Sequence, residues 1–410
     1  MPSLLLSNMK SNMRLCLMAM LLTLTGIVFA QNDDQYLTGN AFLVKGDYTR
    51  AVESLSMAIM RNNSDEHLYI KRGQALLKVN DVLKAIEDFN EANLIDPGVA
   101  DLWLARAYAL DGDHDNALKY LENHLSSAFR ISEDSIKKDP AFNGIQDDPA
   151  WHSLWQKDWY NESEKTAADV MYYMKRKQYE QAVTRLDEAI VKDPDNVELI
   201  QLRGKVFLKQ ENYAAAAGDF SSAIKSDKFS TANFTDRGFA YLKSGRFKDA
   251  VNDYNKALKD DPANFPLYLQ RAEAYAGQAN WPSAIKDIQL YMKYFEDDMH
   301  ALYLCGEYYY SGGDYMNALK CFNRNLKEDP NNALYFKARG KTYLKTATYR
   351  YAISDLSMAL DLSPNDSETW MYHGLSSIQT GDKENGCSSL NKARKLGNTE
   401  AVRYILENCE

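Results

Sequence analysis

The chain has 410 residues and a formal net charge of −9 at pH 7, with 45% apolar and 26% charged residues. This composition excludes a disordered or collagen-like chain and supplies enough apolar surface for a large core. The acidic balance, with a pI near 5.4, also argues against nucleic-acid binding by the chain as a whole.

The first thirty residues have the pattern of a secretory signal peptide. Lys10 and Arg14 form a short basic region, an apolar run follows from Leu15 to Phe29, and Val28 and Ala30 place small side chains before Gln31. This pattern predicts cleavage after Ala30 and export to the periplasm, the outer membrane or the exterior. The alternative is a retained membrane anchor, although the run is shorter than the ~20 residues that span a bilayer comfortably. Cleavage removes two positive charges and leaves a mature chain at −11.

The rest of the chain repeats one unit with a period of 34 residues. The segments RGFAYLKSGRFKDAVNDYNKALKDDP (237–262), RGKTYLKTATYRYAISDLSMALDLSP (339–364) and RGQALLKVNDVLKAIEDFNEANLIDP (72–97) share a small residue, two places that hold an aromatic residue or Leu, an Ala and a closing Pro. Two repeats fit residues 32–99. Seven more fit residues 163–400, with starts at Ser163, Val197, Thr231, Phe265, Met299, Ala333 and Ser367.

The spacing within a repeat predicts two amphipathic helices joined by a turn. Gly or Ala at the eighth place lets the helices approach closely, Ala at the twentieth forms the matching depression, and Pro ends the second helix. The unit resembles the tetratricopeptide repeat, and the resemblance, to an exported bacterial type, covers nearly all of the mature chain. It implies an all-α, right-handed superhelical solenoid of about ten repeats, with a closing helix over residues 399–408.

The period breaks once, after an irregular third repeat near residues 98–125. Trp151, Trp155 and Trp159 lie four residues apart, which predicts one stripe on a helix. We expect this stripe to close a first group of repeats, and the alternative is a ligand site. The prediction is therefore an N-terminal group of three repeats over 31–160 and a C-terminal group of seven repeats with a capping helix over 161–410.

Two places of the repeat vary together within the chain. The seventh and twenty-third places hold Arg and Asp in five repeats, the exchanged pair Asp169 and Arg185 in a sixth, and Cys305 and Cys321 in a seventh. We expect each pair to link the two helices of its repeat, as an exposed ion pair worth ~0.2–1 kcal/mol. Cys305 with Cys321, and Cys387 with Cys409, are candidate disulfides in an exported protein. The alternative for Cys305 and Cys321 is two free buried thiols.

No motif of an enzyme or a cofactor site is present. The sequence contains no phosphate-binding Gly-rich loop, H-E-x-x-H, C-x-x-C or G-x-S-x-G, and its six histidines are scattered. The tyrosines mostly occupy repeat core places. We therefore expect no catalysis, no cofactor and no metal.

The remaining prediction is a surface that binds a partner protein or peptide. In the tetratricopeptide family the first helix of each repeat lines a concave groove, and the corresponding places hold Lys205, Lys209, Phe239, Lys243, Tyr303, Glu307, Tyr310, Lys337, Lys341 and Lys345. Lys337, Lys341 and Lys345 are predicted to form a basic ridge that suits an acidic segment. Alternatively they are ordinary solvated lysines, and the Asn residues of the family's carboxylate clamp are absent. A second hypothesis is a structural part of an envelope assembly or secretion machine, held by convex or edge surfaces.

Overall fold

The computed structural model describes residues 34–127, 130–228 and 230–409 of the chain. Within these ranges the regular structure is helical, and no residue lies in a β-strand. The predicted signal peptide, residues 1–30, lies outside the described residues. None of the described helices has both the length and the apolar character to cross a membrane. The predicted all-α fold class is confirmed for the part of the chain that the structure describes.

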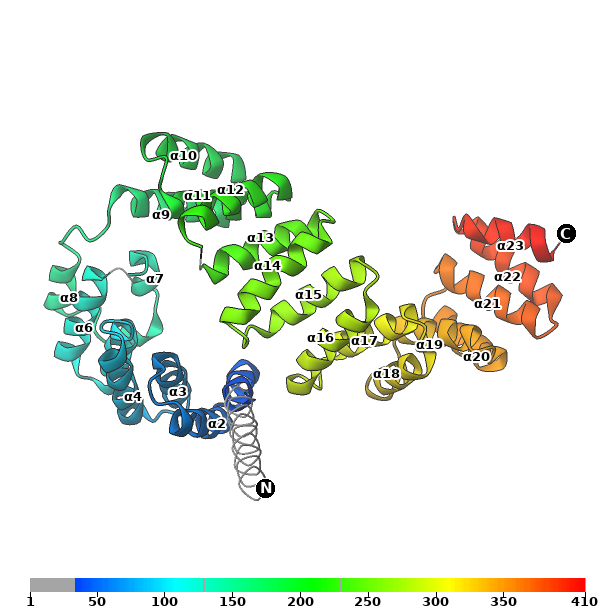
Figure 1. Cartoon of the computed structure of the whole chain (residues 1–410), viewed down its shortest axis with the longest axis horizontal. Coiled ribbons are helices and arrows are strands. Elements are labelled where there is room, and N and C mark those ends of the chain that lie inside the picture. The colour runs from blue at the N-terminus through cyan, green and yellow to red at the C-terminus, as the bar shows by residue number, and fades with distance from the viewer. Residues whose placement is uncertain (1–33, 128–129, 229, 410) are drawn as a thin grey trace, which may run out of the picture. The chain divides into compact units, whose positions relative to one another are not determined.

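The chain divides after Asn212 into two compact units, the N-terminal unit up to Asn212 and the C-terminal unit from Tyr213 to Glu410. The N-terminal unit contains helical residues 34–45, α2 (Tyr48–Arg61), α3 (Glu66–Lys78), α4 (Val82–Ile95), α5 (Asp101–Asp111), α6 (His114–Ser126), α7 (Glu133–Lys137), η1 (Pro140–Phe142), α8 (Pro149–Leu154), α9 (Glu162–Lys175), α10 (Tyr179–Lys192) and α11 (Val197–Lys209) (Figure 1).

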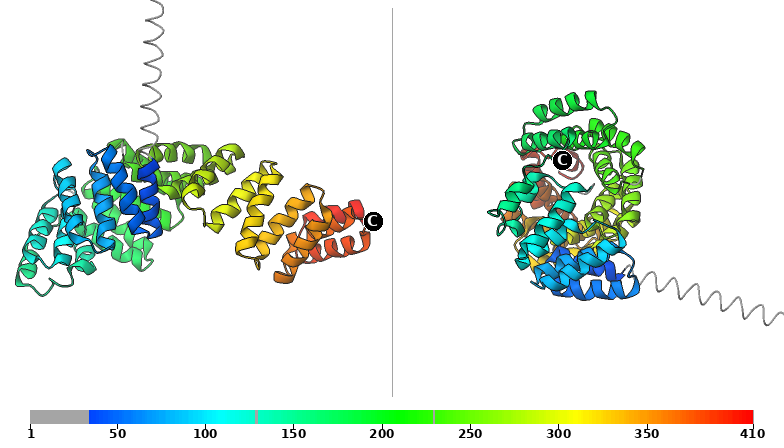
Figure 2. Two further views of the ribbon diagram at one scale, coloured as in Figure 1. Left: turned by 90° about the horizontal axis from the view of Figure 1, so that it is seen from below. Right: turned by 90° about the vertical axis from the view of Figure 1, so that its left-hand side faces the viewer.

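The C-terminal unit continues the same pattern of helix pairs. It contains α12 (Tyr213–Ser226), α13 (Thr231–Lys243), α14 (Phe247–Asp260), α15 (Phe265–Gly277), α16 (Trp281–Tyr294), α17 (Met299–Ser311), α18 (Tyr315–Glu328), α19 (Ala333–Lys345), α20 (Tyr349–Leu362), α21 (Ser367–Gln379), α22 (Lys383–Lys395) and α23 (Glu400–Asn408). Figure 2 shows its helices following one another in chain order from green to red. The second helices α14, α16, α18 and α20 each pack on their own first helix and on the first helix of the next repeat.

The predicted register is confirmed in both units. The first helices α11, α13, α15, α17, α19 and α21 begin at the predicted repeat starts from Val197 to Ser367, and α9 begins one residue before Ser163. The predicted closing helix is α23. The 34-residue spacing therefore locates the helices almost residue by residue.

A small residue at the eighth place allows each helix pair to close around a large side chain. A Cβ on Gly306 would lie 2.5 Å from Phe322 Cε1, and one on Gly238 would lie 2.8 Å from Tyr254 Cε1. Phe322 and Tyr254 are fully buried. The eighth place thus packs on the twenty-fourth, while the alanines of the twentieth place are themselves buried completely: Ala51, Ala85, Ala182, Ala216, Ala250, Ala284, Ala318 and Ala352.

The turn inside each repeat requires one residue in the left-handed region. The fifteenth place has a positive φ in every regular repeat that the structure describes, for example 77° at Gly245 and 55° at Ala279. Glycine accepts this conformation freely, whereas a residue with a Cβ is strained by it. Asp, Asn and Ser side chains then cap many of the following helices, as Asp314 does for α18 by accepting from Asn317 N.

The tryptophan segment differs from the prediction of one helical stripe. Trp151 lies in α8, but α8 ends at Leu154, so Trp155 and Trp159 lie at and beyond its end. All three pack on the apolar cluster that contains Leu121 and Phe142, and Trp159 Nε1 donates to the Leu154 carbonyl at 2.8 Å. The indoles therefore contribute to the core around α5, α6 and α8.

The predicted boundary near residue 160 does not coincide with the division at Asn212. Arg130 Nε lies 2.7 Å from Glu164 Oε1, and Tyr160 Oη donates to the Ile131 carbonyl at 2.8 Å. These contacts join the segment after α6 to the start of α9, so the chain around residue 160 stays within one compact unit. The grouping into three and seven repeats remains a prediction.

Candidate functional site

The predicted links between the two helices of a repeat are present in the structure. Arg237 donates to Asp253 through Nε at 2.7 Å and Nη2 at 2.8 Å, and its Nη1 donates to Ser221 Oγ of the preceding repeat at 3.0 Å. The same bidentate geometry joins Arg72 to Asp88, Arg271 to Asp287, and Arg339 to Asp355. The exchanged pair is also formed, with Arg185 Nε 3.1 Å from Asp169 Oδ2. Arg203 and Asp219, the remaining predicted pair, belong to different units.

The four bidentate pairs are buried, which corrects the expectation of weak exposed ion pairs, whereas the exchanged pair is exposed as expected, with Arg185 and Asp169 at 30% and 55%. The side chains of Asp88, Asp253, Asp287 and Asp355 are only 4% to 8% exposed. Burial raises the pKa of Asp88, and the hydrogen bond to Asp88 raises the pKa of Arg72. Since a buried charge that loses its partner costs about 3–5 kcal/mol, each pair matters to its repeat. The third hydrogen bond of the guanidinium also connects neighbouring repeats.

The four cysteines among the described residues form two different pairs. Cys387 and Cys409 are joined by a disulfide, which ties the end of α23 to α22. Cys305 and Cys321 are both free, so the disulfide expected between them is not formed in this structure. The two thiols are instead hydrogen-bonded to each other. This arrangement corresponds to the free-thiol alternative that the sequence left open.

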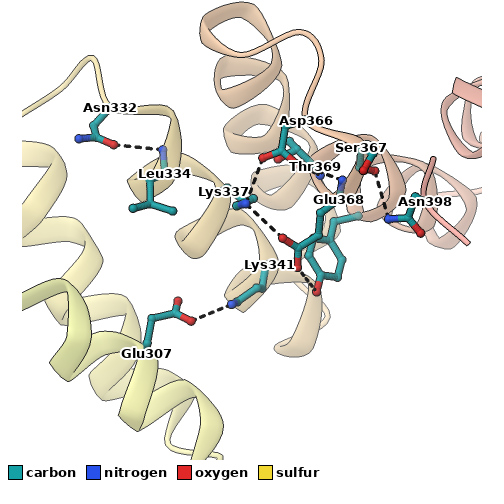
Figure 3. Close-up of polar contacts among 11 residues, drawn as sticks. Glu307, Asn332, Leu334, Lys337, Lys341, Asp366, Ser367, Glu368, Thr369 and Asn398 are labelled. Atoms are coloured by element: carbon teal, nitrogen blue, oxygen red, sulfur yellow. Dashed lines mark hydrogen bonds and ion pairs between the residues drawn. The ribbon is translucent and has the colours of Figure 1, made fainter. Parts of the chain in front are cut away.

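Two lysines of the predicted basic ridge are already paired with carboxylates of neighbouring repeats (Figure 3). Lys337 Nζ lies 3.0 Å from Asp366 Oδ2 and 3.1 Å from Glu368 Oε2, and Lys341 Nζ lies 3.0 Å from Glu307 Oε2. The side chains of Lys337 and Lys341 are 20% and 16% exposed. Because only Lys345 of the three is well exposed, they do not form a free basic ridge.

We call Glu307, Lys337, Lys341, Asp366 and Glu368 the first-helix network, since it connects α17, α19 and the start of α21. Burial lowers the pKa of Lys337, but its hydrogen bonds to the two carboxylates raise it by more. Burial also raises the pKa of Asp366, but the hydrogen bonds from Lys337 and Thr369 N and the charge of Lys337 together lower it by more. Both lysines of the network are thus paired with carboxylates, which leaves little positive charge to offer a partner.

Tyrosine side chains line the first-helix network. Lys341 Nζ lies 4.5 Å from the ring centroid of Tyr310, and Tyr372 Oη donates to Glu368 Oε1 at 3.1 Å. The Tyr303 and Tyr335 rings lie 5.8 Å apart. Burial raises the pKa of Tyr310 to about 12, so its phenol remains a hydrogen-bond donor at neutral pH. The first helices thus present aromatic rings beside two lysines that are already paired with three carboxylates.

The structure brings together only part of the predicted groove set. Tyr303, Glu307, Tyr310, Lys337 and Lys341 lie in or beside the first-helix network. Two further predicted residues lie on α13, where Lys243 Nζ is 5.6 Å from the Phe239 ring centroid and 3.1 Å from Glu273 Oε1. Lys205 and Lys209 are exposed on α11 of the N-terminal unit.

Three members of this surface were missed from the sequence. Glu368 occupies a groove place of its repeat, so the register pointed to it. Asp366 lies just before the repeat, where its carboxylate caps α21 by accepting from Glu368 N and Thr369 N. Tyr372 occupies a different place and reaches Glu368 one helical turn away. No sequence signal distinguishes the last two from ordinary cap and core residues.

One group of acidic and histidine side chains has the spacing of metal ligands among the described residues. The ligand atoms of Asp65, Glu66 and His67 lie within 4.8 Å of one another. The three residues are consecutive, and Asp65 caps α3 by accepting from His67 N at 3.0 Å. Helix capping therefore accounts for this cluster.

Comparison with protein families identifies the repeat. Models described as "TPR repeat" and "Tetratricopeptide repeat" match residues 104–135, 172–211, 238–278 and 269–333. No match is found among curated protein sequences.

Solved structures with similar folds are also repeat proteins. The C-terminal part of a TPR repeat-containing protein from Cytophaga hutchinsonii is 18% identical, with a TM-score of 0.49, and the match covers 58% of this chain and 98% of that one. A tetratricopeptide repeat protein from Parabacteroides merdae is 20% identical, with a TM-score of 0.47, and the match covers 60% and 97%. Both TM-scores are below 0.5, so neither structure supports a conclusion about this chain. The family matches, the confirmed 34-residue register and the helix pairs together show that the chain is a tetratricopeptide-repeat protein.

Proposed function

We propose that the chain is a non-catalytic scaffold, exported to the cell envelope, that binds a segment of a partner protein on the first helices of the C-terminal unit. Stacked repeats provide extended binding surfaces, because neighbouring helix pairs present the same face side by side. The sequence of residues 1–30 supports export. No nucleic acid, cofactor or metal is part of this proposal.

The observation that carries the proposal is the first-helix network. Glu307, Lys341, Lys337 and Glu368 connect three successive first helices at distances of 3.0 to 3.1 Å. A surface held in place before binding loses less conformational entropy when a partner docks. Because both lysines of the network are already paired with carboxylates, we expect the partner segment to use hydrogen bonds and aromatic or apolar contacts, with an acidic group reaching at most the exposed Lys345.

A matched pair of exposed residues tests this surface. Leu334 on α19 and Met358 on α20 are 42% and 44% exposed, so a photo-crosslinking residue at either position is equally accessible. After expression in the native host, crosslinks from position 334 and none from position 358 support the proposal. Crosslinks from position 358 alone contradict it. Cell fractionation and N-terminal sequencing test export and cleavage after Ala30.

A second candidate function, a structural part of an envelope assembly, has its own observation. The twenty-ninth place lies near the end of the second helix, and in the N-terminal unit it holds Met60, Leu94 and Val191, which are 84%, 77% and 80% exposed. In the C-terminal unit the same place holds only charged residues: Lys225, Lys259, Lys293, Lys327, Asp361 and Lys395. Exposed apolar side chains at one repeated place favour contact with another protein. Crosslinks from position 94 but not from position 334 would favour this candidate.

A further inference from the structure

One repeat of the C-terminal unit replaces the buried ion pair with two thiols. Cys305 on α17 and Cys321 on α18 occupy the places that Arg237 and Asp253 hold in the repeat of α13 and α14. The ion pair there is formed at 2.7 Å, so these two places face each other across a helix pair. Cys321 accordingly packs on the cluster that contains Cys305.

The two thiols differ in environment. Cys305 is 3% exposed, whereas Cys321 is partly exposed on the second helix. The hydrogen bond from Cys305 lowers the pKa of Cys321, and Arg324 and Lys320 lower it further. The same hydrogen bond, together with burial, raises the pKa of Cys305. One thiol is therefore partly exposed with a lowered pKa, which makes it the more reactive of the two, and the other is buried behind it with a raised pKa.

The thiol repeat also lacks the bond that an arginine makes to the preceding repeat. Arg237 reaches Ser221, and Arg271 reaches Asn255 Oδ1 at 2.8 Å. Gln289 holds the corresponding place before Cys305, and its Nε2 donates to Tyr309 Oη. A thiol is too short to replace the guanidinium. The polar link between the helices of this repeat is therefore made by the two thiols alone, and it does not extend to the preceding repeat.

We propose that Cys321 and Cys305 form a dithiol site that undergoes thiol–disulfide exchange with a disulfide of another molecule. The Cys321 thiolate attacks one sulfur of that disulfide and forms a mixed disulfide, and the released thiolate takes up a proton. Cys305 then loses its proton and attacks Cys321 Sγ, which displaces the second thiolate. The protein dithiol is oxidised to a Cys305–Cys321 disulfide, and the external disulfide is reduced to two thiols.

Exchange at this site changes the connection between α17 and α18 from a hydrogen bond to a covalent bond. Cys305 lies on the buried face of α17 and is two residues from Tyr303 and Glu307, which belong to the proposed binding surface on the same helix. The exchange itself does not require any partner on that surface, so the two proposals stand or fall separately.

The test uses the full chain and oxidised glutathione as the probe. The wild-type protein, with Cys305 and Cys321 as free thiols and Cys387 joined to Cys409, is incubated with oxidised glutathione, and peptide mass mapping then follows each cysteine. We expect one Cys305–Cys321 disulfide and two molecules of reduced glutathione per chain. We also expect Cys321 to react with an alkylating agent at least ~10-fold faster than Cys305, in keeping with their thiolate fractions. Cys387 and Cys409 serve as an internal reference that stays joined.

Two variants separate exchange from a merely structural pair. Cys305→Ser removes the second thiol, and we expect a stable glutathione adduct on Cys321. The double variant Cys305→Arg with Cys321→Asp restores the pair of the other repeats, and it should keep the thermal stability of the wild type while releasing no glutathione. If Cys305→Ser does not fold, the glutathione yield of the wild type still decides the question.

The proposal is overturned by either of two results. In the first, the wild type leaves both thiols alkylatable after exposure to oxidised glutathione, which shows an inert pair. Alternatively, the native protein carries a Cys305–Cys321 disulfide that excess reduced glutathione does not open, which shows a permanent structural link.

Discussion

The repeat of α13 and α14 and the repeat of α17 and α18 have the same backbone register but different chemistry at their centres. Both close a small residue onto a ring, as Gly238 meets Tyr254 and Gly306 meets Phe322. The first repeat then joins its helices through Arg237 and Asp253, and the second through Cys305 and Cys321. The difference shows that apolar packing specifies the helix pair. The two residues that link the helices at its centre can therefore be replaced by residues of a different chemistry.

The largest expected effect breaks the ion pair of the first repeat. Asp253→Ala leaves the Arg237 guanidinium largely buried without its carboxylate, and we expect the free energy of unfolding to fall by about 3–5 kcal/mol. Urea denaturation followed by circular dichroism measures the change. Cys321→Ala is the matched control in the thiol repeat, and its cost should stay below about 1.5 kcal/mol because no charge is stranded. Equal losses of unfolding free energy for the two variants would contradict the view that the ion pair and the thiol pair contribute differently to their repeats.

A buried histidine gives the N-terminal unit a pH dependence. His124 is 3% exposed, its Nε2 accepts from Ile131 N at 3.1 Å, and burial together with the nearby Arg106 lowers its pKa to about 4. The unfolded chain therefore binds more protons between pH 6.5 and pH 4, so stability is full above pH 6.5 and falls as the pH drops. The full loss is about 3 kcal/mol, at about 1.4 kcal/mol for each unit of pKa difference.

Hydrogen exchange of the N-terminal unit between pH 7 and pH 5 measures this loss after correction for the intrinsic rates. The variant His124→Gln keeps a hydrogen-bond acceptor but cannot titrate, and its stability should change much less over the same range. A pH dependence equal to that of the wild type would show that other groups cause the effect.

The close approach at the eighth place predicts a smaller effect in the same two repeats. Gly306→Ala brings a Cβ to 2.5 Å from Phe322, and Gly238→Ala brings one to 2.8 Å from Tyr254. We expect losses of about 1–3 kcal/mol, larger for Gly306, because a packed ring must move. Gly218→Ala in α12 is the control, since its Cβ meets no atom within 4 Å and alanine favours a helix. Thermal denaturation that ranks Gly218→Ala lowest would refute the packing argument.

The smallest expected effect concerns the turn between the two helices. Ala279 has a φ of 55°, where a Cβ is strained and glycine is not. Ala279→Gly should therefore raise the free energy of unfolding by about 1 kcal/mol, and Gly245→Ala should lower it by a similar amount. Denaturant midpoints of the two variants should move in opposite directions, and a shift of both in the same direction rules out this explanation.

The repeat register accounts for how much of the fold could be predicted. Glycine or alanine at the eighth place, alanine at the twentieth and proline at the end recur every 34 residues, so Thr231 and Met299 were recognised as helix starts. The tryptophan segment has no such repetition. Its spacing of four residues suggested one helix, but Trp155 and Trp159 lie at and past the end of α8 because the indoles pack on a shared core there.

The candidate surface could be predicted only in part. The register identified Lys337 and Lys341 as residues of the first-helix face, yet it gave no reason to expect their carboxylate partners. Asp366 is separated from Lys337 by 29 residues and Glu307 from Lys341 by 34, so stacking of the repeats decides these contacts. The sequence immediately around a lysine is the same whether its ammonium group is free or paired with a carboxylate of another helix.

The sequence by itself determined the helical class, the length of the repeat and the residues that face each other within a helix pair, because periodic apolar side chains and small residues act locally. The tertiary structure alone decided the degree of burial of the Arg–Asp pairs, the neutralisation of the lysines and the free state of Cys305 and Cys321. These properties depend on how far side chains from neighbouring repeats reach and on the water that they exclude, which a one-dimensional pattern does not contain.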